Sequence, residues 1–316
     1  MWEVLCAGVF WSALGLLAYV HFGYPLILVL LRRVRPRPVA RADIHPSVDL
    51  LIGAYNEKAV IREKIENCLA LDYPRDRLRI RVASDVSTDG TDDIVREYAP
   101  RGVELVVAPR RRGKAANFRE IVPTLTGDIV VFSDAASLYR GDTLKKLVRN
   151  FADPQVGCVG GRIRYRNPDA SSVSQGEGLY WRYEVFLREA ESAIGSAMVL
   201  SGAVYAMRRE LYRAVPDDLP DDFLSPLHVL DQGRRVLYEA DTEIWETMAT
   251  SARGEMLTKV RIIARNFAAL RRMRHLLNPL RDPLLALQLF SHRFLRWFVL
   301  PLAFLLLVSS LGLVHR

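Results

Sequence analysis

VDLLIGAYNE, residues 48–57, is a short apolar run that ends abruptly in polar residues. The apolar part, Val48 to Ile52, has the length and composition of a buried parallel strand. Apolar residues then recur at helical spacing, at Ile61, Ile65, Cys68 and Leu69, so a helix over 61–69 is predicted to follow the strand. The two elements together form the first half of a strand–helix–strand unit.

The same alternation continues along the chain. Further strands are predicted over 79–83, 103–108 and 129–133, with helices over 89–98 and 114–125 between them. Alternation on this scale predicts right-handed βαβ units and an α/β fold with a mostly parallel sheet. Ligands of such sheets bind beyond the carboxyl ends of the strands. Candidate functional residues are therefore sought at those ends.

Polar side chains cluster at three of the predicted strand ends. The first strand runs into Ala54-Tyr55-Asn56-Glu57, the second into Asp85, and the fourth into Asp134. Arg110-Arg111-Arg112-Gly113-Lys114 concentrates positive charge at the start of a predicted helix. Carboxylates next to a basic helix N-terminus suit a metal-bound diphosphate, because acids bind the cation while lysine and backbone amides meet the phosphates.

The order and spacing of these clusters resemble those of the family 2 glycosyltransferases. These inverting enzymes have a Rossmann-like GT-A domain with a mixed sheet and include the cellulose, chitin and hyaluronan synthases. The resemblance rests on residues 54–57, on Asp85 with Asp89-Gly90-Thr91, and on residues 113–117. It covers roughly residues 47–270 and the apolar segments on either side. It implies transfer of a sugar from a nucleotide diphosphate, usually UDP, to an acceptor hydroxyl.

The resemblance also assigns residues to the donor site. Asp85 would hold the base and ribose, and Lys114 would lie near the phosphates. Asp134 would be the first acid of the Asp-x-Asp motif that binds Mg²⁺ or Mn²⁺, but the third position here is Ala136. Metal binding is therefore expected to rest on Asp134, the diphosphate oxygens and water. The full set of expected donor-site residues is Ala54, Tyr55, Asn56, Glu57, Asp85, Lys114, Asp134 and Gly202.

The second half of the chain supplies the expected catalytic groups. Asp221-Asp222 resembles the Glu-Asp motif of the family, in which the second acid deprotonates the acceptor hydroxyl. Arg261 or Arg265 would stabilise the leaving diphosphate. Both lie where processive members carry Gln-x-x-Arg-Trp, and that glutamine and tryptophan are not evident here. Limited transfer to a lipid-linked or saccharide acceptor is therefore favoured. A processive polysaccharide synthase and an inactive nucleotide-sugar-binding scaffold, the latter suggested by Ala136, remain the alternatives.

Both ends of the chain are strongly apolar. Residues 4–31 and 294–314 are each long enough for a membrane-spanning helix, which needs about 20 apolar residues. A cleavable signal peptide is the competing interpretation of the first stretch. Arginines flank the inner side of both stretches, so the positive-inside rule places the middle of the chain in the cytoplasm. The expected segments are a membrane helix over 1–33, a linker over 34–46, a catalytic domain over 47–253, interfacial helices over 254–292 and a membrane helix over 293–316.

Net charge and cysteine content limit the remaining function classes. The formal net charge is +8, and much of it lies at the membrane flanks, with no basic stripe interleaved with aromatic residues, so nucleic acid is not an expected partner. Cys6, Cys68 and Cys158 are far apart, which argues against a disulfide framework or a zinc site. The expected protein is an integral membrane glycosyltransferase of polysaccharide or glycolipid synthesis, as in a bacterial inner membrane. Homo-oligomers and partner subunits remain open.

Overall fold

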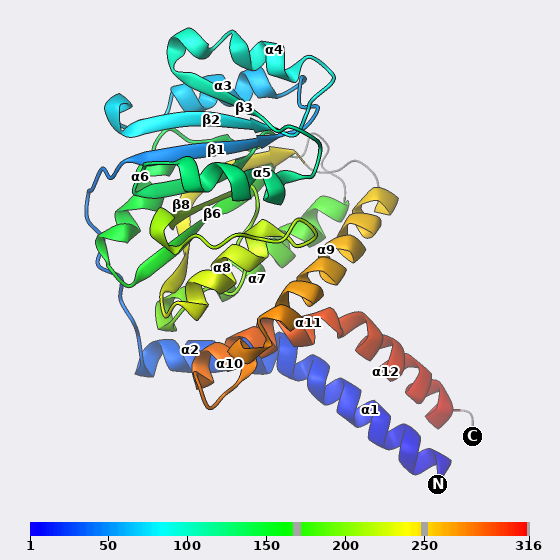
Figure 1. The fold of residues 1–316 in the computed structure, drawn as a ribbon. Helices are drawn as coiled ribbons and strands as arrows, with labels where there is room; N and C mark the ends of the chain where they lie inside the picture. Colours follow the sequence, from blue (N-terminus) through cyan, green and yellow to red (C-terminus); the bar gives the residue numbers. More distant parts are fainter. Residues whose placement is uncertain (167–171, 248–251, 315–316) are drawn as a thin grey trace.

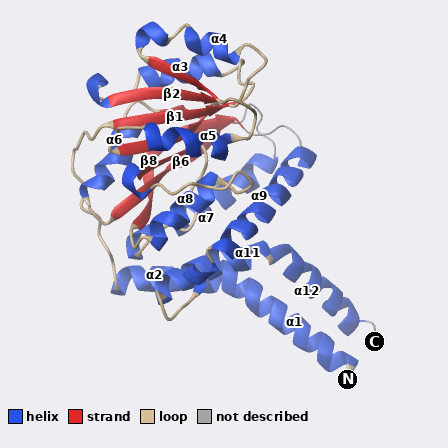
Figure 2. Cartoon of the chain, in the orientation of Figure 1, coloured by secondary structure: helices blue, strands red, loops and turns tan. Residues whose placement is uncertain are grey.

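One mixed sheet of eight strands lies at the centre of the computed structural model, which describes residues 1–166, 172–247 and 252–314. Helices cover both faces of this sheet (Figures 1 and 2). The strand order is β3-β2-β1-β4-β7-β6-β8-β5. The strands are β1 Val48–Ala54, β2 Leu78–Ser84, β3 Val103–Val107, β4 Ile129–Asp134, β5 Leu138–Tyr139, β6 Val156–Arg166, β7 Val204–Arg208 and β8 Arg235–Thr247.

The first four strands confirm the predicted parallel arrangement. β1 lies between β2 and β4 and is parallel to both, with Gly53 opposite Ala83 on one side and opposite Asp134 on the other. The carboxyl ends of these three strands are therefore neighbours at one edge. This register brings the predicted polar clusters to a common rim.

The second half of the sheet makes it mixed. β7 is antiparallel to both β4 and β6, whereas β6 and β8 are parallel. β8 and β5 were not predicted from the sequence. β8 contains the charged run Glu239-Ala240-Asp241-Thr242-Glu243, which interrupts its apolar pattern, and its register against β6 shifts twice.

The helices form a layer on each face. The α-helices between the two apolar segments are α3 Ile61–Leu69, α4 Thr91–Arg96, α5 Lys114–Ile121, α6 Thr143–Val148, α7 Ser172–Ile194, α8 Asp221–Asp231 and α9 Ala252–Arg272. Two are shorter than predicted. α4 begins only after Gly90, whose φ of 94° is left-handed, and α5 gives way to a 3₁₀ turn over Val122–Thr124, which contains the helix-breaking Pro123.

Alternate side chains of β1 pack into the two hydrophobic cores, one on each face of the sheet. Leu51 packs in the core that contains Phe118 of α5. Leu50 and Ile52 point to the opposite face, into the core that contains Ile65 of α3. Each of these side chains is almost completely buried. The period-two alternation of a strand thus converts one apolar run into contacts with both helical layers.

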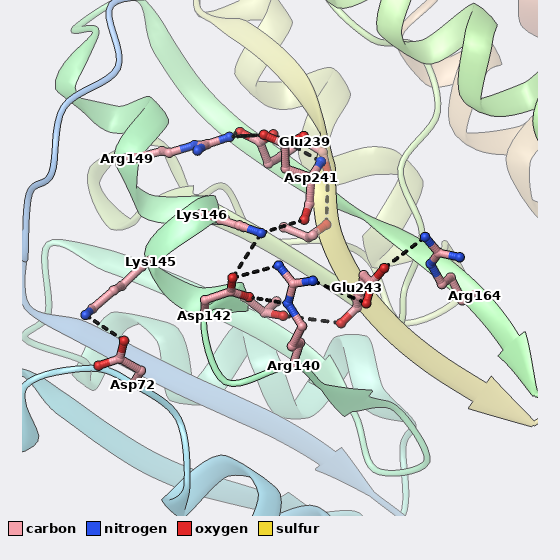
Figure 3. A network of polar contacts seen from close by, with 12 residues as sticks. Asp72, Arg140, Asp142, Lys145, Lys146, Arg149, Arg164, Glu239, Asp241 and Glu243 are labelled. Atoms are coloured by element: carbon pink, nitrogen blue, oxygen red, sulfur yellow. Dashed lines mark hydrogen bonds and ion pairs between the residues drawn. The ribbon is translucent and has the colours of Figure 1, made fainter.

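A network of ion pairs joins α6 to the last strands of the sheet (Figure 3). Glu243 of β8 accepts from Arg164 of β6 at 2.8 Å and from Arg140 at 3.4 Å. Arg149 contacts Glu239 at 3.1 Å and Asp241 at 2.6 Å. The network provides oppositely charged partners for the polar middle of β8. It attaches β8, which lies next to the edge strand β5, to the residues on either side of α6.

The two apolar ends of the chain form helices that leave the domain side by side (Figure 1). Trp2–Val34 is helical throughout, as α1 Trp2–Ala18, a π-helical turn and α2 Tyr24–Val34, with a mean hydropathy of 2.0 in its most apolar window. The C-terminal segment comprises α10 Pro283–Gln288, a π-helical turn, α11 Leu295–Trp297 and α12 Val299–Val314. By length and composition the N-terminal segment could cross a membrane, and the C-terminal segment could do so if its bent pair of helices forms one span.

The C-terminal segment differs from the single straight helix expected from residue 294 onward. It bends by 58° between Trp297 and Val299. Pro301 lies just beyond the bend and has no N–H to donate to the carbonyl group of Trp297. α9, within the predicted interfacial segment, also buries one side, because Ala269 and Leu270 belong to the domain core while Val260 and Ile263 are exposed.

Buried carboxylates on α7 bind both apolar segments. Glu191, which is fully buried, accepts hydrogen bonds from the Tyr24 hydroxyl of α2 and from the Met198 N–H. Nδ1 of His292, in the C-terminal segment, lies 2.8 Å from the same carboxylate. Glu184, about two helical turns earlier, pairs with Arg296. These contacts fix the base of both apolar helices to the catalytic domain.

Replacing Glu191 is expected to weaken this junction. Glu191→Ala removes the acceptor for Tyr24 and leaves buried polar groups unpaired, so we expect a loss of about 3–5 kcal/mol in stability, seen as a lower melting temperature of the detergent-solubilised protein. Glu189→Ala on the exposed side of the same helix is the control and should change little. Equal melting temperatures for the two variants would contradict the proposed role of the junction.

Candidate active site

A cavity of about 580 Å³ opens beside the carboxyl ends of the central strands. Its walls come from the start of α5, the end of β4, the loop before β7, the start of α8, and α9. The sequence-predicted residues that line it are Lys114, Asp134, Gly202, Asp221, Asp222, Arg261 and Arg265. Residues from both halves of the chain, as far apart as 114 and 265, thus meet in one cavity.

Lys114 lies among the carboxylates of this cavity. Its Nζ atom is 2.7 Å from Oδ1 of Asp134 and 3.7 Å from Oδ2 of Asp221. Burial alone would lower the pKa of Lys114, but the neighbouring carboxylates outweigh it and raise that pKa well above its usual value. The side chain reaches this place across Gly53 of β1, where an added Cβ would lie 3.2 Å from the Cγ of Lys114. The lysine is therefore a fixed cation at the strand ends.

The two acids at the start of α8 have different surroundings. Asp221 accepts a hydrogen bond from the buried hydroxyl of Tyr205 at 3.0 Å, which ties it to β7. Asp222 lines the cavity. Burial, and next the charge of Asp221, raise the pKa of Asp222 to about 6, against the opposing effect of Lys114 and Arg293. A carboxylate with this pKa is ionised at neutral pH and can still accept a proton.

The oxygens present fit a cation that is shared with a ligand. A Cβ added at Gly202 would lie 3.2 Å from Oδ2 of Asp222 and 3.5 Å from Oδ2 of Asp134, so both carboxylates face the same glycine. Such oxygens are the ligands that Mg²⁺ and Mn²⁺ prefer. Within the described residues, however, no group of three or more His, Cys, Asp or Glu could hold a metal ion. A cation here would need further oxygens, such as those of a diphosphate.

Asp85 fixes the loop that leads into α5. Its carboxylate, which is 6% exposed, accepts the backbone N–H groups of Arg112 at 3.0 Å and Gly113 at 2.9 Å. The side-chain amide of Asn117 donates to it at 3.2 Å. This arrangement positions Lys114, the first residue of the helix. A contact of Asp85 with a nucleotide stays a prediction.

The first polar cluster, residues 54–57, does not line the 580 Å³ cavity. The Asn56 side chain accepts the Thr88 N–H at 2.8 Å, and the Arg111 guanidinium lies 3.9 Å from the centre of the Tyr55 ring. Ala54 accepts the Asp85 N–H through its carbonyl. Burial and the charge of Asp134 raise the pKa of Glu57. The cluster is thus connected to the same loops, and its role toward a nucleotide also stays a prediction.

Two charged residues near Asp134 were missed in the sequence. Lys64 of α3 is fully buried and donates a hydrogen bond to the carbonyl of Ser137, in the turn that follows Asp134. Burial lowers its pKa to about 8. Burial and the charge of Asp134 raise the pKa of Glu246 in β8 to about 7. The apolar spacing of Ile61, Ile65 and Cys68 could have identified Lys64 as inward-facing, whereas Glu246 lies on an unpredicted strand.

The cavity also includes arginines that the sequence analysis did not assign. Arg293 comes from the C-terminal apolar segment, and its guanidinium lies 4.8 Å from the centre of the Phe223 ring. Arg188 of α7, only 5% exposed, also lines the cavity. A membrane-candidate segment therefore contributes a side chain to the same cavity as Asp222.

Comparisons with known proteins extend this picture. The family model described as "Glycosyltransferase like family 2" matches residues 45–265. The beta-monoglucosyldiacylglycerol synthase of Synechocystis sp. is 29% identical over 175 residues, which are 54% of this chain and 36% of that protein. An N-acetylglucosaminyltransferase of Rhizobium sp. strain N33 is 25% identical over 246 residues, covering 72% and 54% of the two chains. The matched regions thus span well under two thirds of these relatives.

Solved structures resemble the fold over a larger share of the chain. The mannosyltransferase PcManGT from Pyrobaculum calidifontis, in complex with GDP-Man and Mn²⁺, has a TM-score of 0.77 and 27% identity, covering 98% of this chain and 87% of that one. Staphylococcus aureus TarS 1–349, in complex with UDP-GlcNAc, has a TM-score of 0.56 and 16% identity, covering 78% and 72%. The predicted GT-A fold is confirmed.

Asp222→Asn is expected to stabilise the protein near pH 7.5. The raised pKa of Asp222 means that its ionised form is less favourable in the folded than in the unfolded chain, so above about pH 6 the substitution should gain roughly 1–3 kcal/mol. The gain should disappear as the pH falls toward about 4, where the carboxyl is protonated in the folded chain and increasingly in the unfolded one. Thermal melts across this pH range measure it.

Asp218→Asn is the control for this experiment. Asp218 is exposed in the loop just before α8, so its replacement should leave the melting temperature nearly unchanged at every pH. A melting temperature for Asp222→Asn at or below that of the wild type at neutral pH would contradict the assigned environment.

Proposed function

Because the chain belongs to glycosyltransferase family 2, we propose that it transfers a sugar, with inversion, from a nucleotide diphosphate to a hydroxyl group of a membrane-associated acceptor. The observation that carries the proposal is the convergence of Lys114, Asp134 and Asp222 in one cavity. A cation and two carboxylates gathered beside the ends of parallel strands can bind a metal–diphosphate and activate a hydroxyl group.

Asp222 is the proposed general base. The acceptor hydroxyl oxygen bonds to the anomeric carbon while the bond from that carbon to the diphosphate breaks, and the hydroxyl proton moves to Asp222. Its pKa of about 6 suits this step, because the carboxylate is both ionised and a sufficiently strong base near neutral pH. Asp221, held by Tyr205, would position the start of α8.

Cations in the cavity would stabilise the leaving diphosphate. Lys114 already contacts carboxylates, and Arg261 and Arg265 of α9 line the same cavity. Within the described residues Arg261 has no ion-pair partner, which leaves its charge available to a phosphate. A divalent cation, bound through Asp134 and the donor, would neutralise further negative charge on the diphosphate.

Two nucleotides are candidates for the donor. The family resemblance favours UDP, whereas the PcManGT structure contains GDP-Man. Both nucleotides therefore belong in any test. Metal dependence has support from the same structure, which contains Mn²⁺.

A membrane-associated acceptor is supported by the geometry of the cavity. Arg293 of the C-terminal apolar segment lines it together with Asp222, so an acceptor held at the membrane surface would lie near the base. The Synechocystis relative is named for a glycolipid product. Arginines follow α2 and precede α10, which supports an integral membrane protein with its catalytic domain on the cytoplasmic side.

Release of nucleoside diphosphate from purified protein tests the proposal. UDP-glucose, UDP-N-acetylglucosamine and GDP-mannose would be supplied with Mg²⁺ or Mn²⁺ and a membrane lipid extract. We expect metal-dependent release from one donor, a single sugar added per acceptor, and a loss of at least about 100-fold in kcat for Asp222→Asn, since general-base catalysis contributes about 10²–10⁴-fold. Turnover that survives in Asp222→Asn would contradict the assignment. A ladder of long products would instead indicate a processive synthase.

The activity is expected to fall on the acid side of about pH 6. Protonation of Asp222, whose pKa is about 6, removes the base, so log kcat should decline with unit slope as the pH decreases. A pH profile measured at saturating donor tests this. Nucleotide binding should persist at the lower pH, and an activity that is flat down to about pH 5 would exclude Asp222 as the base.

Gly202→Ala tests the close approach of the two carboxylates. An added Cβ would press against Oδ2 of Asp222 at 3.2 Å, so we expect a decrease of at least about tenfold in kcat with little change in melting temperature. Gly141→Ala is the matched control because its Cβ would meet nothing within 4 Å. Full activity of Gly202→Ala would show that these oxygens are not needed at their present positions.

A further inference from the structure

A second cavity lies away from the catalytic one. It has a volume of about 910 Å³ and is enclosed by the end of α2, the linker after it, the end of α7, the turn between α8 and β8, and α10. Two of these walls, α2 and α10, belong to the membrane-candidate segments. It contains none of the residues assigned to sugar transfer. We refer to it as the junction cavity.

The junction cavity has a cationic side. Arg35, Arg37, Arg234 and Arg235 line it, against Asp282 as the single lining acid. Arg35 is exposed and, within the described part of the chain, has no ion-pair partner. Asp282 already accepts the N–H of Leu285 at the start of α10. The local charge is therefore positive and not neutralised within the cavity.

Arg235 contributes a buried charge. It is 5% exposed, and its guanidinium donates to the carbonyl groups of Gly195, Pro38, Arg37 and Ser192. Carbonyl oxygens satisfy its N–H groups but carry no full negative charge. Asp153 attracts the guanidinium electrostatically, but no carboxylate of the described residues forms an ion pair with it. A buried cation without a directly paired counter-ion is costly, so an anion in the adjoining cavity would stabilise it.

An unpaired amide also lines the junction cavity. Gln288 of α10 is 1% exposed, and its Nε2 atom has no hydrogen-bond partner in the structure. Buried polar groups are nearly always hydrogen-bonded, and one that is not needs an explanation. Gln288 lines the cavity, so rotation of its amide toward the cavity would let a ligand oxygen provide the missing acceptor. This observation is independent of the arginine charges and points to the same kind of ligand.

The remaining wall is apolar. Leu31 and Val34 of α2 face the cavity, as do Leu284 and Leu287 of α10. A ligand that satisfies both sides must carry an anionic head and a hydrocarbon part. Because α2 and α10 are membrane-candidate segments, such a ligand can reach the cavity from the bilayer.

We propose that the junction cavity binds the phosphate group of an anionic membrane lipid, with the lipid's hydrocarbon chain against α2 and α10. Bound there, the lipid would link the exit of the N-terminal membrane segment to the catalytic domain. The site would make attachment of the two parts depend on the lipid composition of the membrane. The proposal requires that the two apolar segments are embedded in a bilayer, but it does not depend on the proposed sugar transfer.

Lipid binding to the purified full chain tests the proposal. Native mass spectrometry in detergent would compare phosphatidylglycerol with phosphatidylcholine as probes. We expect phosphatidylglycerol to bind at least about tenfold more tightly and to raise the melting temperature. Arg35→Glu combined with Arg234→Glu should remove that preference and leave phosphatidylcholine binding unchanged. Equal binding of the two lipids by the wild type would overturn the proposal.

Arg33→Glu is the control for charge alone. Arg33 is an exposed arginine in the last turn of α2 that does not line the junction cavity, so its replacement should change phosphatidylglycerol binding by less than about twofold. An equal loss in this variant would show only diffuse attraction to a basic surface. Glycerol 1-phosphate provides a further arm, because full competition by this soluble phosphate would show that the site does not require a lipid.

Gln288→Leu keeps the test valid if the double variant fails to fold. It removes the unpaired amide without adding charge, so folding should be retained or improved. Phosphatidylglycerol binding should still weaken by at least about threefold, because the lipid loses a hydrogen-bond donor. Unchanged lipid binding in this variant would contradict the role assigned to Gln288 and to the cavity.

Discussion

The contact of the partly buried Lys114 ammonium group with neighbouring carboxylates is the interaction on which the candidate site depends. It is the first residue of α5, and it contacts Asp134 at the end of β4 while lying near Asp221 at the start of α8. Without this cation, two neighbouring acids would repel each other in a partly buried place. Asp85 in turn holds the loop that delivers the lysine. One cation thus joins the parallel half of the sheet to the half that provides the proposed base.

The membrane-candidate segments depend on a second group of buried charges. Glu191 and Glu184 of α7 bind Tyr24, His292 and Arg296. The same part of the structure brings Arg293 into the catalytic cavity. The C-terminal apolar segment must therefore pack against α7 for Arg293 to take its place in the catalytic cavity. Such a link suits an enzyme whose acceptor lies at a membrane surface.

Sequence reasoning recovered the first half of the fold because its signals are local. β1, β2, β3 and β4 are short apolar runs, each followed by turn or helix signals, and a parallel arrangement places their ends together. β8 was missed because its charged middle is compensated by partners distant in sequence, such as Arg149 and Arg164. The bend before α12 was missed because an apolar pattern indicates how long a helix can be but not whether the helix is straight. Whether Pro301 bends the helix depends on which carbonyl group is left without an N–H donor.

The site was predictable to the extent that its residues belong to contiguous motifs. Lys114, Asp134 and Asp222 each stand in a recognisable local pattern and meet in the cavity. Lys64, Glu246 and Arg293 lie in no such motif, and only the tertiary structure brings them near Asp134 or Asp222. The family is confirmed, while the individual roles of these residues rest on geometry.

Titration of UDP and GDP onto the purified protein, with and without Mn²⁺, tests the central claim most directly. The claim is that Lys114 and Asp134 form the diphosphate site of a nucleotide-sugar donor. It predicts that one nucleotide binds in a metal-dependent manner, that Asp134→Asn abolishes the metal dependence, and that Lys114→Met weakens binding at least about tenfold. If neither nucleotide binds, or if both variants bind as the wild type does, the account of this cavity is wrong.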